Sequence, residues 1–421
     1  MLRFKNKQIV IYYFGLIGLF FLLLNTGTIY SNYREKLSQF FLLLGGLCSI
    51  VLMFISNKLV LKHSLLLIIT FCIIVLFDSL VTDVSKSALF FIIKMCVVFL
   101  ILSILKNNSI DIKKILLKET KIFLIWGLLN YFISLTFIEA LPVFHTFALP
   151  NGVIRKIYLG LFIENYSAIE IFGLTIPRLH GPFSEPGVTQ FFYNLGFILC
   201  IFDKQNNDKS RGLWCLLFVI SIFLCLSLSG LIIIFLTFLF YLSKKKDKTK
   251  VFFMLSLGFL ICGLLVISKI GSISLIERSS DYLYILEQAI KYFPFGIGIG
   301  NKDSLPLWFN PYANSYVTPG LYSGLLTPML YLGVFSVYYY ALIYFSIRYF
   351  SLNDKIMNLA FGSYLLVTLF TQPYEFSIIV CVFISNGAIN KNISDYEKKY
   401  CFEKDCNESP ISLNDLIERK S

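Results

Sequence analysis

The sequence is poor in charge. Only 15% of its 421 residues are charged, 57% are hydrophobic, and several apolar runs reach 15 residues or more. A soluble protein of this length could not bury such runs. The runs also lack the strict alternation of apolar and polar residues that marks the strands of a membrane β-barrel. Because backbone groups in hydrocarbon must find partners within their own segment, these absences predict an all-α polytopic membrane protein.

Two further absences concern the N-terminus and the thiols. The first apolar run follows Arg3, Lys5 and Lys7, as in a signal peptide, but it lacks an Ala-x-Ala cleavage site, which predicts an uncleaved first span. Eight of the ten cysteines fall in predicted spans and the other two, Cys401 and Cys406, in the C-terminal tail, so no disulfide is expected. The Cys-x4-Cys spacing of the tail has no partner histidines and is weak evidence for zinc.

Hydrophobic runs divide the chain into about twelve predicted transmembrane helices. They cover residues 8–25, 37–55, 59–77, 88–105, 122–141, 188–202, 213–227, 230–242, 251–268, 321–347, 357–372 and 376–389. Residues 1–390 are therefore expected to form a single membrane domain. Residues 391–421 form a polar tail of mixed charge, which we expect to be cytoplasmic and mostly disordered.

The distribution of lysine and arginine predicts the orientation of the spans. With the N-terminus inside, 26 of the 37 basic residues lie in cytoplasmic segments or, in the case of Lys62, at the cytoplasmic end of a span, outer segments hold 10, and Lys94 lies within a span. Basic residues concentrate on the cytoplasmic side, so we expect a multi-pass protein of the cytoplasmic (inner) membrane with both termini in the cytoplasm. The net charge of +12 then reports topology and contact with anionic membrane lipids, not binding to nucleic acid.

Residues 213–242 allow two interpretations. They form either one long tilted helix or two short spans that meet at Ser227, Ser229 and Gly230. One long helix would place the lysine-rich segment 244–250 outside, against the distribution of basic residues elsewhere. Two short spans are therefore favoured, in a locally thinned or protein-enclosed region.

Two predicted external loops, residues 142–187 and 269–320, are the long ones, and long loops often carry binding or catalysis. In the first, Arg155 to about Phe172 has the pattern of an interfacial helix. Such a helix either lies over a lipid-bound substrate or merely covers the spans.

The second long loop opens with a helical pattern that begins at Ser274 and stops at Pro294. Alternate glycines follow in the segment 296–301. No strand precedes them, so the segment is more typical of a plain turn than of a dinucleotide-binding site.

The first long loop ends in a compact polar string, Arg178-Leu-His-Gly-Pro-Phe-Ser-Glu-Pro-Gly187, which we call the RHE string. Its Glu185 is the best-placed carboxylate for accepting a proton from a hydroxyl group, and partial burial would raise its pKa. A plainer alternative is that Arg178 and Glu185 brace the loop as an ion pair. His180 is a candidate helper in catalysis, although a lone histidine is more often structural.

Arginines are the candidate anion-binding groups. An enzyme that acts on a polyprenyl-diphosphate-linked sugar must neutralise the leaving diphosphate with a divalent metal or with fixed cations. The chain has no Asp-x-Asp motif, which favours arginine, whose planar fork binds diphosphate oxygens bidentately, and no metal or cofactor is expected. The two long loops contain three arginines, Arg155, Arg178 and Arg278. Candidates for catalysis are Arg178, His180, Glu185 and Arg278, and candidates for substrate binding are Arg155, Asp281, Tyr282 and Asn301.

Several motifs, in this order along the chain, carry a family resemblance. The RHE string is similar to the arginine, glycine, phenylalanine and glutamate-proline string that precedes a span in Wzy-type polysaccharide polymerases, within the O-antigen ligase and polymerase superfamily. Ser227-Leu-Ser-Gly230 resembles their serine-rich hairpin. The segment from Arg278 to Asn301 resembles the opening of their second large loop, and residues 325–335 resemble the span that follows. The match covers roughly residues 120 to 372.

The resemblance implies a GT-C-like, metal-independent membrane glycosyltransferase. Such an enzyme transfers a growing glycan from undecaprenyl diphosphate onto the next carrier-linked repeat unit at the outer membrane face. Arg178 and Arg278 would take the roles of the arginines that clamp the carrier diphosphates. The implied partners are undecaprenyl-diphosphate-linked oligosaccharide and the chain-length regulator and flippase of the same pathway. The product class, capsule, O-antigen or another exopolysaccharide, stays open.

Three alternatives stay open. Ligases of this superfamily carry a histidine late in the second large loop, and the absence of histidine after His180 favours a polymerase. A flippase or exporter of lipid-linked sugars predicts cationic residues inside the spans and internal repeats, whereas Lys94 is nearly alone and no repeat is evident. A purely structural membrane component gives no reason for arginines beside glycine and proline in the two longest outer loops.

Overall fold

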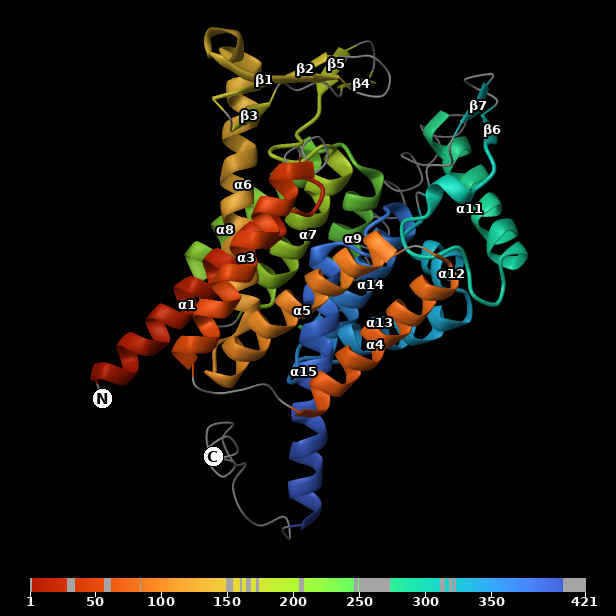
Figure 1. The fold of residues 1–421 in the computed structure, drawn as a ribbon. Coiled ribbons are helices and arrows are strands. Elements are labelled where there is room, and N and C mark those ends of the chain that lie inside the picture. Colours follow the sequence, from red (N-terminus) through yellow and green to blue (C-terminus); the bar gives the residue numbers. More distant parts are fainter. Residues whose placement is uncertain are drawn as a thin grey trace.

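The chain forms a helical bundle with three small sheets (Figure 1). The computed structural model describes residues 2–28, 35–56, 62–83, 85–148, 154–159, 161–163, 168–171, 174–203, 208–245, 249, 273–310, 315–317, 321 and 323–403. The predicted span at 251–268, most of the segment 244–250, and Tyr322 lie outside these residues.

The helices and strands follow the apolar runs closely. The helices are α1 (Leu2–Leu23), α3 (Glu35–Ser56), α4 (Lys62–Val81), α5 (Ser85–Asn107), α6 (Ile112–Thr136), α7 (Pro186–Ile201), α8 (Asp208–Leu224), α9 (Leu228–Lys244), α11 (Ile273–Lys291), α12 (Thr327–Leu332), α13 (Ser336–Arg348), α14 (Lys355–Thr371) and α15 (Ile378–Glu403). Short 3-10 turns are η1 (Ile138–Ala140), η2 (Lys302–Ser304) and η3 (Gly333–Phe335). The strands are β1 (Val143–Ala148), β2 (Ile154–Tyr158), β3 (Phe162–Ile163), β4 (Ala168–Ile171), β5 (Leu174–Pro177), β6 (Trp308–Asn310) and β7 (Ser315–Val317).

The protein is a helical membrane protein. Large apolar side chains face outward from its helices, and Phe54 and Leu80 are each 80% exposed, which only a lipid environment accommodates at this density. Among the described residues, four helical segments are long and apolar enough to span a membrane: Lys36–Ser56, Ser64–Val81, Lys86–Asn107 and Thr327–Arg348. Five shorter apolar helices accompany them. The helical membrane class is thus confirmed, but the described residues do not contain twelve full-length spans.

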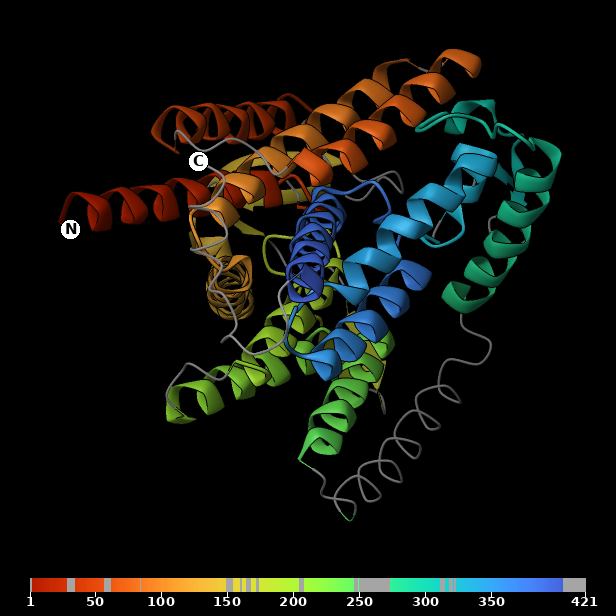
Figure 2. The same ribbon diagram turned by 90° about the horizontal axis from the view of Figure 1, so that it is seen from below.

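Two helices form the centre of the bundle. Every residue of α7 except Gly187 is buried, and so are nearly all residues of α15 from Ile378 to Asn390, which packs against α4, α5 and α13. Figure 2 shows α15 end-on among the other helices. A helix that is apolar all round is stable only when it is enclosed, so these two helices are the core around which the loops are placed. Helix α15 continues to Glu403, into the segment predicted as a disordered tail, whose residues 404–421 lie outside the described part.

The predicted interfacial helix at residues 155–172 is wrong. The described residues of this segment form strands: β2 pairs antiparallel with β1 and β3, and β4 pairs with β5 in a hairpin. The apolar and polar residues of Ala168-Ile-Glu-Ile171 and Leu174-Thr-Ile-Pro177 alternate with period two, and Ile and Thr favour strands. In this segment the helical spacing of a few apolar residues is a weaker indication of structure than this alternation.

Of the two interpretations of residues 213–242, the structure shows two short helices and not one long helix. Helix α8 ends at Leu224 and α9 begins at Leu228, and Leu226 between them has a φ of 47°. A left-handed residue cannot continue a right-handed helix, so the chain reverses here. The predicted span at 321–347 is also interrupted, since it begins as α12 only at Thr327 and is broken at Gly333 before α13.

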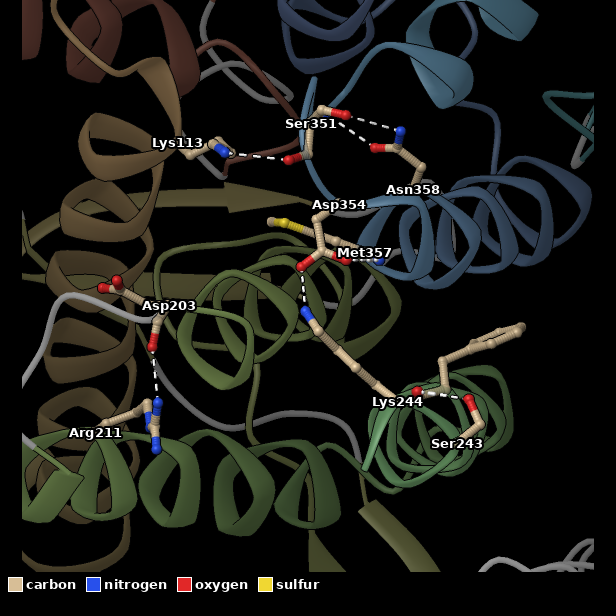
Figure 3. A network of polar contacts seen from close by, with 10 residues as sticks. Lys113, Asp203, Arg211, Ser243, Lys244, Ser351, Asp354, Met357 and Asn358 are labelled. Carbon is tan, nitrogen blue, oxygen red and sulfur yellow. Dashed lines mark hydrogen bonds and ion pairs between the residues drawn. The ribbon is translucent and has the colours of Figure 1, made fainter. Parts of the chain in front are cut away.

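Polar contacts join several helix ends at the face of the bundle opposite to β1–β5 (Figure 3). Lys113 at the start of α6 donates to the Ser351 hydroxyl at 3.4 Å. Lys244 at the end of α9 forms an ion pair with Asp354, whose other carboxylate oxygen accepts the N–H of Met357 at 3.1 Å and caps α14. These contacts bring segments that are distant in sequence to one face.

Asp354 is expected to stabilise the fold mainly as a helix cap. Asp354→Ala removes both the cap and the ion pair, so we expect it to lower the free energy of unfolding by about 1 to 2 kcal/mol. Lys244→Ala leaves the cap in place, removes the partly exposed ion pair and the contact of the Lys244 ammonium with the Phe202 ring, and should cost about half of that or less. Thermal unfolding of the detergent-solubilised variants measures both. Equal losses for the two variants would contradict the capping role.

Candidate substrate site

The RHE string is held against three different helices. The N–H of Leu179 donates to the Leu224 carbonyl at the end of α8 at 2.9 Å, and the N–H of Ser184 donates to the Gly27 carbonyl after α1 at 3.0 Å. Between them Gly181 has a φ of +54° and lies so close to Gly127 of α6 that a Cβ would come within 2.8 Å of the Gly127 Cα. The backbone of the string is therefore fixed, and only glycine fits at its centre.

Arg178 begins the string directly after β5 and closes the end of α8. Its Nε donates to the Cys225 carbonyl at 2.9 Å and its Nη2 to the Leu226 carbonyl at 3.4 Å. Carbonyls at a helix C-terminus lack partners within the helix and carry partial negative charge, so a guanidinium is well suited to them. A guanidinium has five N–H groups, and these two bonds leave the others for a ligand.

Arg278 lies on α11 and acts electrostatically on Arg178. Burial lowers the pKa of the Arg178 guanidinium, and the positive charge of Arg278 lowers it further, whereas Cys225 and Glu185 act in the opposite direction. The half-buried Arg278 side chain has no hydrogen bond or ion pair within the described part of the chain. Arg178 thus lies within electrostatic range of a second cation and of a carboxylate, and the attraction of the carboxylate offsets the repulsion between the cations.

Glu185 is placed differently from the sequence prediction. It is the N-cap residue of α7, with a φ of −147°, its side chain makes no capping hydrogen bond, and that side chain is exposed and not partly buried. Both Arg178 and Glu185 are described, and the two side chains form no ion pair. The brace alternative therefore fails in this structure, and the carboxylate is accessible.

His180 has the structural position that its plain interpretation predicts. Its side chain is fully buried, and its carbonyl accepts the N–H of Phe183 at 3.1 Å and the hydroxyl of Thr189 at 2.6 Å. These contacts close the turn of the RHE string onto the first turn of α7. The His180 side chain is thus closed to solvent, whereas that of Glu185 is open to it.

Tyr374 is a member of the site that sequence reasoning missed. It lies between α14 and α15, is 6% exposed, and packs its ring against Phe191 of α7 at 5.1 Å between centroids. Burial raises the pKa of its hydroxyl, the charge of Glu185 raises it further, and the charge of Arg278 lowers it. This hydroxyl has no hydrogen-bond partner among the described residues. A tyrosine beside a predicted span gives no signal in the sequence, because aromatic residues are common at membrane interfaces.

Glu375 follows Tyr374 and was also missed. Its side chain is 6% exposed, and Oε2 has no hydrogen-bond partner within the described residues. Burial raises the pKa of this carboxyl to about 7 from an ordinary 4.5. The carboxylate has a hydrogen bond from its own backbone N–H, but a buried carboxylate oxygen without a donor, such as Oε2, is costly and therefore points to a functional demand.

Glu375 makes the stability of the fold depend on pH. Its neutral form contributes stability that is fully present below pH 4.5 and is lost as the pH rises through about 7. We therefore expect Glu375→Gln to unfold at a higher temperature than the wild type at about pH 8, a gain of roughly 3 kcal/mol, and at a similar temperature at about pH 4.5. Thermal unfolding at the two pH values measures this. If the difference in unfolding temperature between Glu375→Gln and the wild type were the same at both pH values, the proposed pH dependence would be contradicted.

Three of the four predicted substrate-binding residues have visible structural contacts. Asp281 is buried, and its carboxylate accepts the N–H of Leu321 at 3.2 Å. Tyr282 donates its hydroxyl to the Phe370 carbonyl at 2.8 Å and packs on that ring. Asn301 donates to the Ile297 carbonyl at 3.0 Å.

The Tyr282 contact fastens α11 to α14, the Asp281 contact fastens α11 to the end of the second loop, and the Asn301 contact is local. Arg155 lies on β2 opposite Phe147 of β1, in the sheet at the far end of α6.

The glycine segment 296–301 has the structural role of the plain-turn interpretation. Gly296, Gly298 and Gly300 all have positive φ angles, and the N–H groups of Ile297 and Gly298 donate to carbonyls of α12 at 3.0 Å. A Cβ at Gly296 would come within 2.6 Å of two of those carbonyl oxygens. The segment thus docks the second loop onto α12, which helps to position α11 and Arg278.

No protein-family model, curated protein or solved structure matches this chain. Its site is therefore interpreted from its own geometry and chemistry. The described residues contain no group of three or more His, Cys, Asp or Glu side chains positioned to hold a metal ion.

The serine-rich turn leads from the site into the bundle. The hydroxyls of Ser227 and Ser229 lie 3.1 Å apart, Gln190 of α7 donates to Ser229 at 3.4 Å, and Asn194 donates to Gln190 at 2.8 Å. Gly230 allows the close approach of α9, since a Cβ there would meet Gln190 Oε1 at 3.1 Å. Such polar contacts hold apolar helices together and fix the turn that carries the partners of Arg178.

Proposed function

We propose that this protein is a membrane glycosyltransferase that polymerises polyprenyl-diphosphate-linked oligosaccharide repeat units. The observation that carries the proposal is the electrostatic interaction of Arg178, at the start of the RHE string, with Arg278 of α11 and with the exposed carboxylate of Glu185. Two guanidiniums with free N–H groups are suited to a diphosphate, whose oxygens they bind in pairs. A dianion between them would replace their mutual repulsion with attraction.

The arrangement suits an inverting transfer. A hydroxyl oxygen of the acceptor sugar attacks the anomeric carbon of the donor, and the bond from that carbon to the carrier diphosphate breaks. The bonding electrons leave with the diphosphate, and Arg178 and Arg278 stabilise its charge. Glu185 accepts the proton from the attacking hydroxyl. His180 stabilises the backbone turn of the RHE string and does not contact the substrate.

We infer the membrane arrangement from the same contacts. The face that carries the RHE string and the turn 372–377 is the outer one, and the polar network of Lys113, Lys244 and Asp354 lies at the cytoplasmic face of the inner membrane. The short apolar helices then also cross, in a locally thinned bilayer, which brings the number of spans closer to twelve. A GT-C-like arrangement and both termini in the cytoplasm are part of this proposal.

The competing classes predict different surroundings. A flippase for anionic carriers needs cations along a path within the bundle, but the unpartnered buried charges on the described helices α4 and α6 are acidic, Asp78 and Glu119. Neither side chain is a cation that could bind a diphosphate on such a path, so the polymerase is favoured. A ligase-type transfer uses the same arginines and differs in its acceptor.

Deletion of the gene tests the proposed function in the cell. We expect cells without this protein to retain single lipid-linked repeat units at the outer membrane face and to lose long surface polysaccharide. Gel profiles of polysaccharide length and surface labelling of the repeats measure the two properties. Repeat units confined to the cytoplasmic face would instead indicate a flippase, and normal long chains would refute the proposal. A flippase and a chain-length regulator of the same pathway are the partners that such an assay includes.

A further inference from the structure

The turn between α14 and α15, residues 372–377, contributes to the site from two neighbouring positions. Tyr374 lies within electrostatic range of Glu185 and Arg278. Glu375 lies against the end of the second loop, where a Cβ at Gly324 would come within 2.8 Å of its Oε2. Gly324 therefore places no side chain against this carboxylate oxygen. The turn thus carries Tyr374, which interacts with the charged cluster, directly before a buried carboxylate that interacts with Lys302.

We propose that Glu375 is a further substrate-binding residue of this site, which accepts a hydrogen bond from a hydroxyl group of the acceptor sugar. The inference rests on the proposed function, since it assigns the acceptor side of the same reaction. A carboxylate can only accept hydrogen bonds, and a sugar offers several hydroxyl donors. Oε2 lacks such a donor among the described residues.

The surrounding contacts fix the position of Glu375. The Tyr339 hydroxyl of α13 donates to the Glu375 carbonyl at 3.0 Å. The carbonyl of Gln372 accepts the N–H of Gly324 at 3.1 Å and that of Tyr374 at 3.0 Å, which joins the turn to the end of the second loop. A carboxylate held by its own backbone in this way is preorganised, so it loses little entropy when it binds a hydroxyl.

No charged side chain among the described residues is paired with the Glu375 carboxylate, so it can accept a hydrogen bond from an uncharged hydroxyl group. The titratable groups that interact with it are Lys302 of η2, Tyr331 of α12, and Tyr339 and Tyr340 of α13. The charge of Lys302 favours the ionised carboxylate, but no ion pair joins the two side chains among the described residues. The three tyrosines are neutral at ordinary pH and do not compete as charged partners.

Kinetics with the full-length protein in liposomes tests the assignment. The probe is the pool of lipid-linked repeat units extracted from cells that lack this protein. We expect Glu375→Gln to raise the apparent KM for these units about tenfold with kcat nearly unchanged, because the charge-assisted hydrogen bond is weakened and the chemistry is not. In the wild type this KM should fall as the pH rises through about 7, and in the variant it should not change.

Controls separate the possible failures. Glu287→Gln alters an exposed glutamate of α11 and should behave as wild type. If Glu375→Gln does not fold, Glu375→Asp is tested in its place. An unchanged KM and pH profile in Glu375→Gln would overturn the assignment. A wild type that extends no repeat unit would refute the proposed function instead. In that case binding of the same lipid-linked units is measured by the rise in unfolding temperature that they cause. If this rise is equal in the wild type and in Glu375→Gln, Glu375 does not bind the units.

Discussion

Replacement of Arg278 with alanine is expected to lower chain elongation about a hundredfold to a thousandfold, with normal amounts of folded protein in the membrane. The physical reason is that its guanidinium has no structural partner among the described residues, so its loss removes charge from the site and little from the fold. The rate of elongation in liposomes that contain lipid-linked repeat units measures the effect. Arg278→Lys keeps the positive charge but loses the planar guanidinium that binds two oxygens at once, so it should retain a small part of the activity.

Arg178 and Arg348 serve as comparisons for Arg278. Arg178→Ala should lose activity as strongly but also some stability, because the carbonyls of Cys225 and Leu226 lose their donor. Arg348→Ala removes an arginine that stacks on Tyr344 in α13, away from the site, and should retain normal activity. If Arg278→Ala elongates chains at the wild-type rate, the proposed clamp for the diphosphate is wrong.

Glu185→Gln is expected to lower kcat about a hundredfold to ten-thousandfold with little change in the KM for repeat units. The amide has the same size and position at the N-cap of α7, but it cannot take up a proton. Because this side chain is exposed and makes no ion pair with Arg178, folding should be unaffected. Single-turnover elongation assays measure the chemical step directly.

The exposed Glu287 of α11 provides the matched control, since Glu287→Gln makes the same chemical change outside the site. If Glu185→Gln raised the KM as much as Glu375→Gln does and left kcat unchanged, the Glu185 carboxylate would bind the substrate and would not accept its proton. The effects of Glu185→Gln and Glu375→Gln are therefore predicted to be opposite in kind, one on kcat and one on KM.

The helical part of the fold was largely predictable because an apolar run in a membrane has one backbone solution. The break between α8 and α9 was also predictable, since the lysines after α9 required a second crossing. The hairpins β1 to β5 were not predicted, because a few apolar residues in a loop fit two periodicities and only the pairing of strands distinguishes them. About twelve spans were predicted, whereas among the described residues only four helical segments are long and apolar enough to cross a membrane, because hydropathy and charge do not fix helix length in the folded bundle.

The candidate site was predictable only in part. Arg178, Arg278 and Glu185 stand out in the sequence because charges are rare in the chain, and the structure brings them within electrostatic range. Tyr374 and Glu375 lie in a short turn between two apolar helices, where no spacing or motif marks them. Their placement depends on α15 at the centre of the bundle and on the end of the second loop beside it. Such long-range packing cannot be read from local pattern.

The most direct test of the proposed polymerase uses the purified wild-type protein in liposomes, with extracted lipid-linked repeat units as the sole substrate. The proposal predicts that long lipid-linked glycans accumulate over time, with release of the carrier diphosphate, and that Arg278→Ala forms only single units. Repeat units that move across the bilayer without any increase in length, or that stay unchanged, would contradict it.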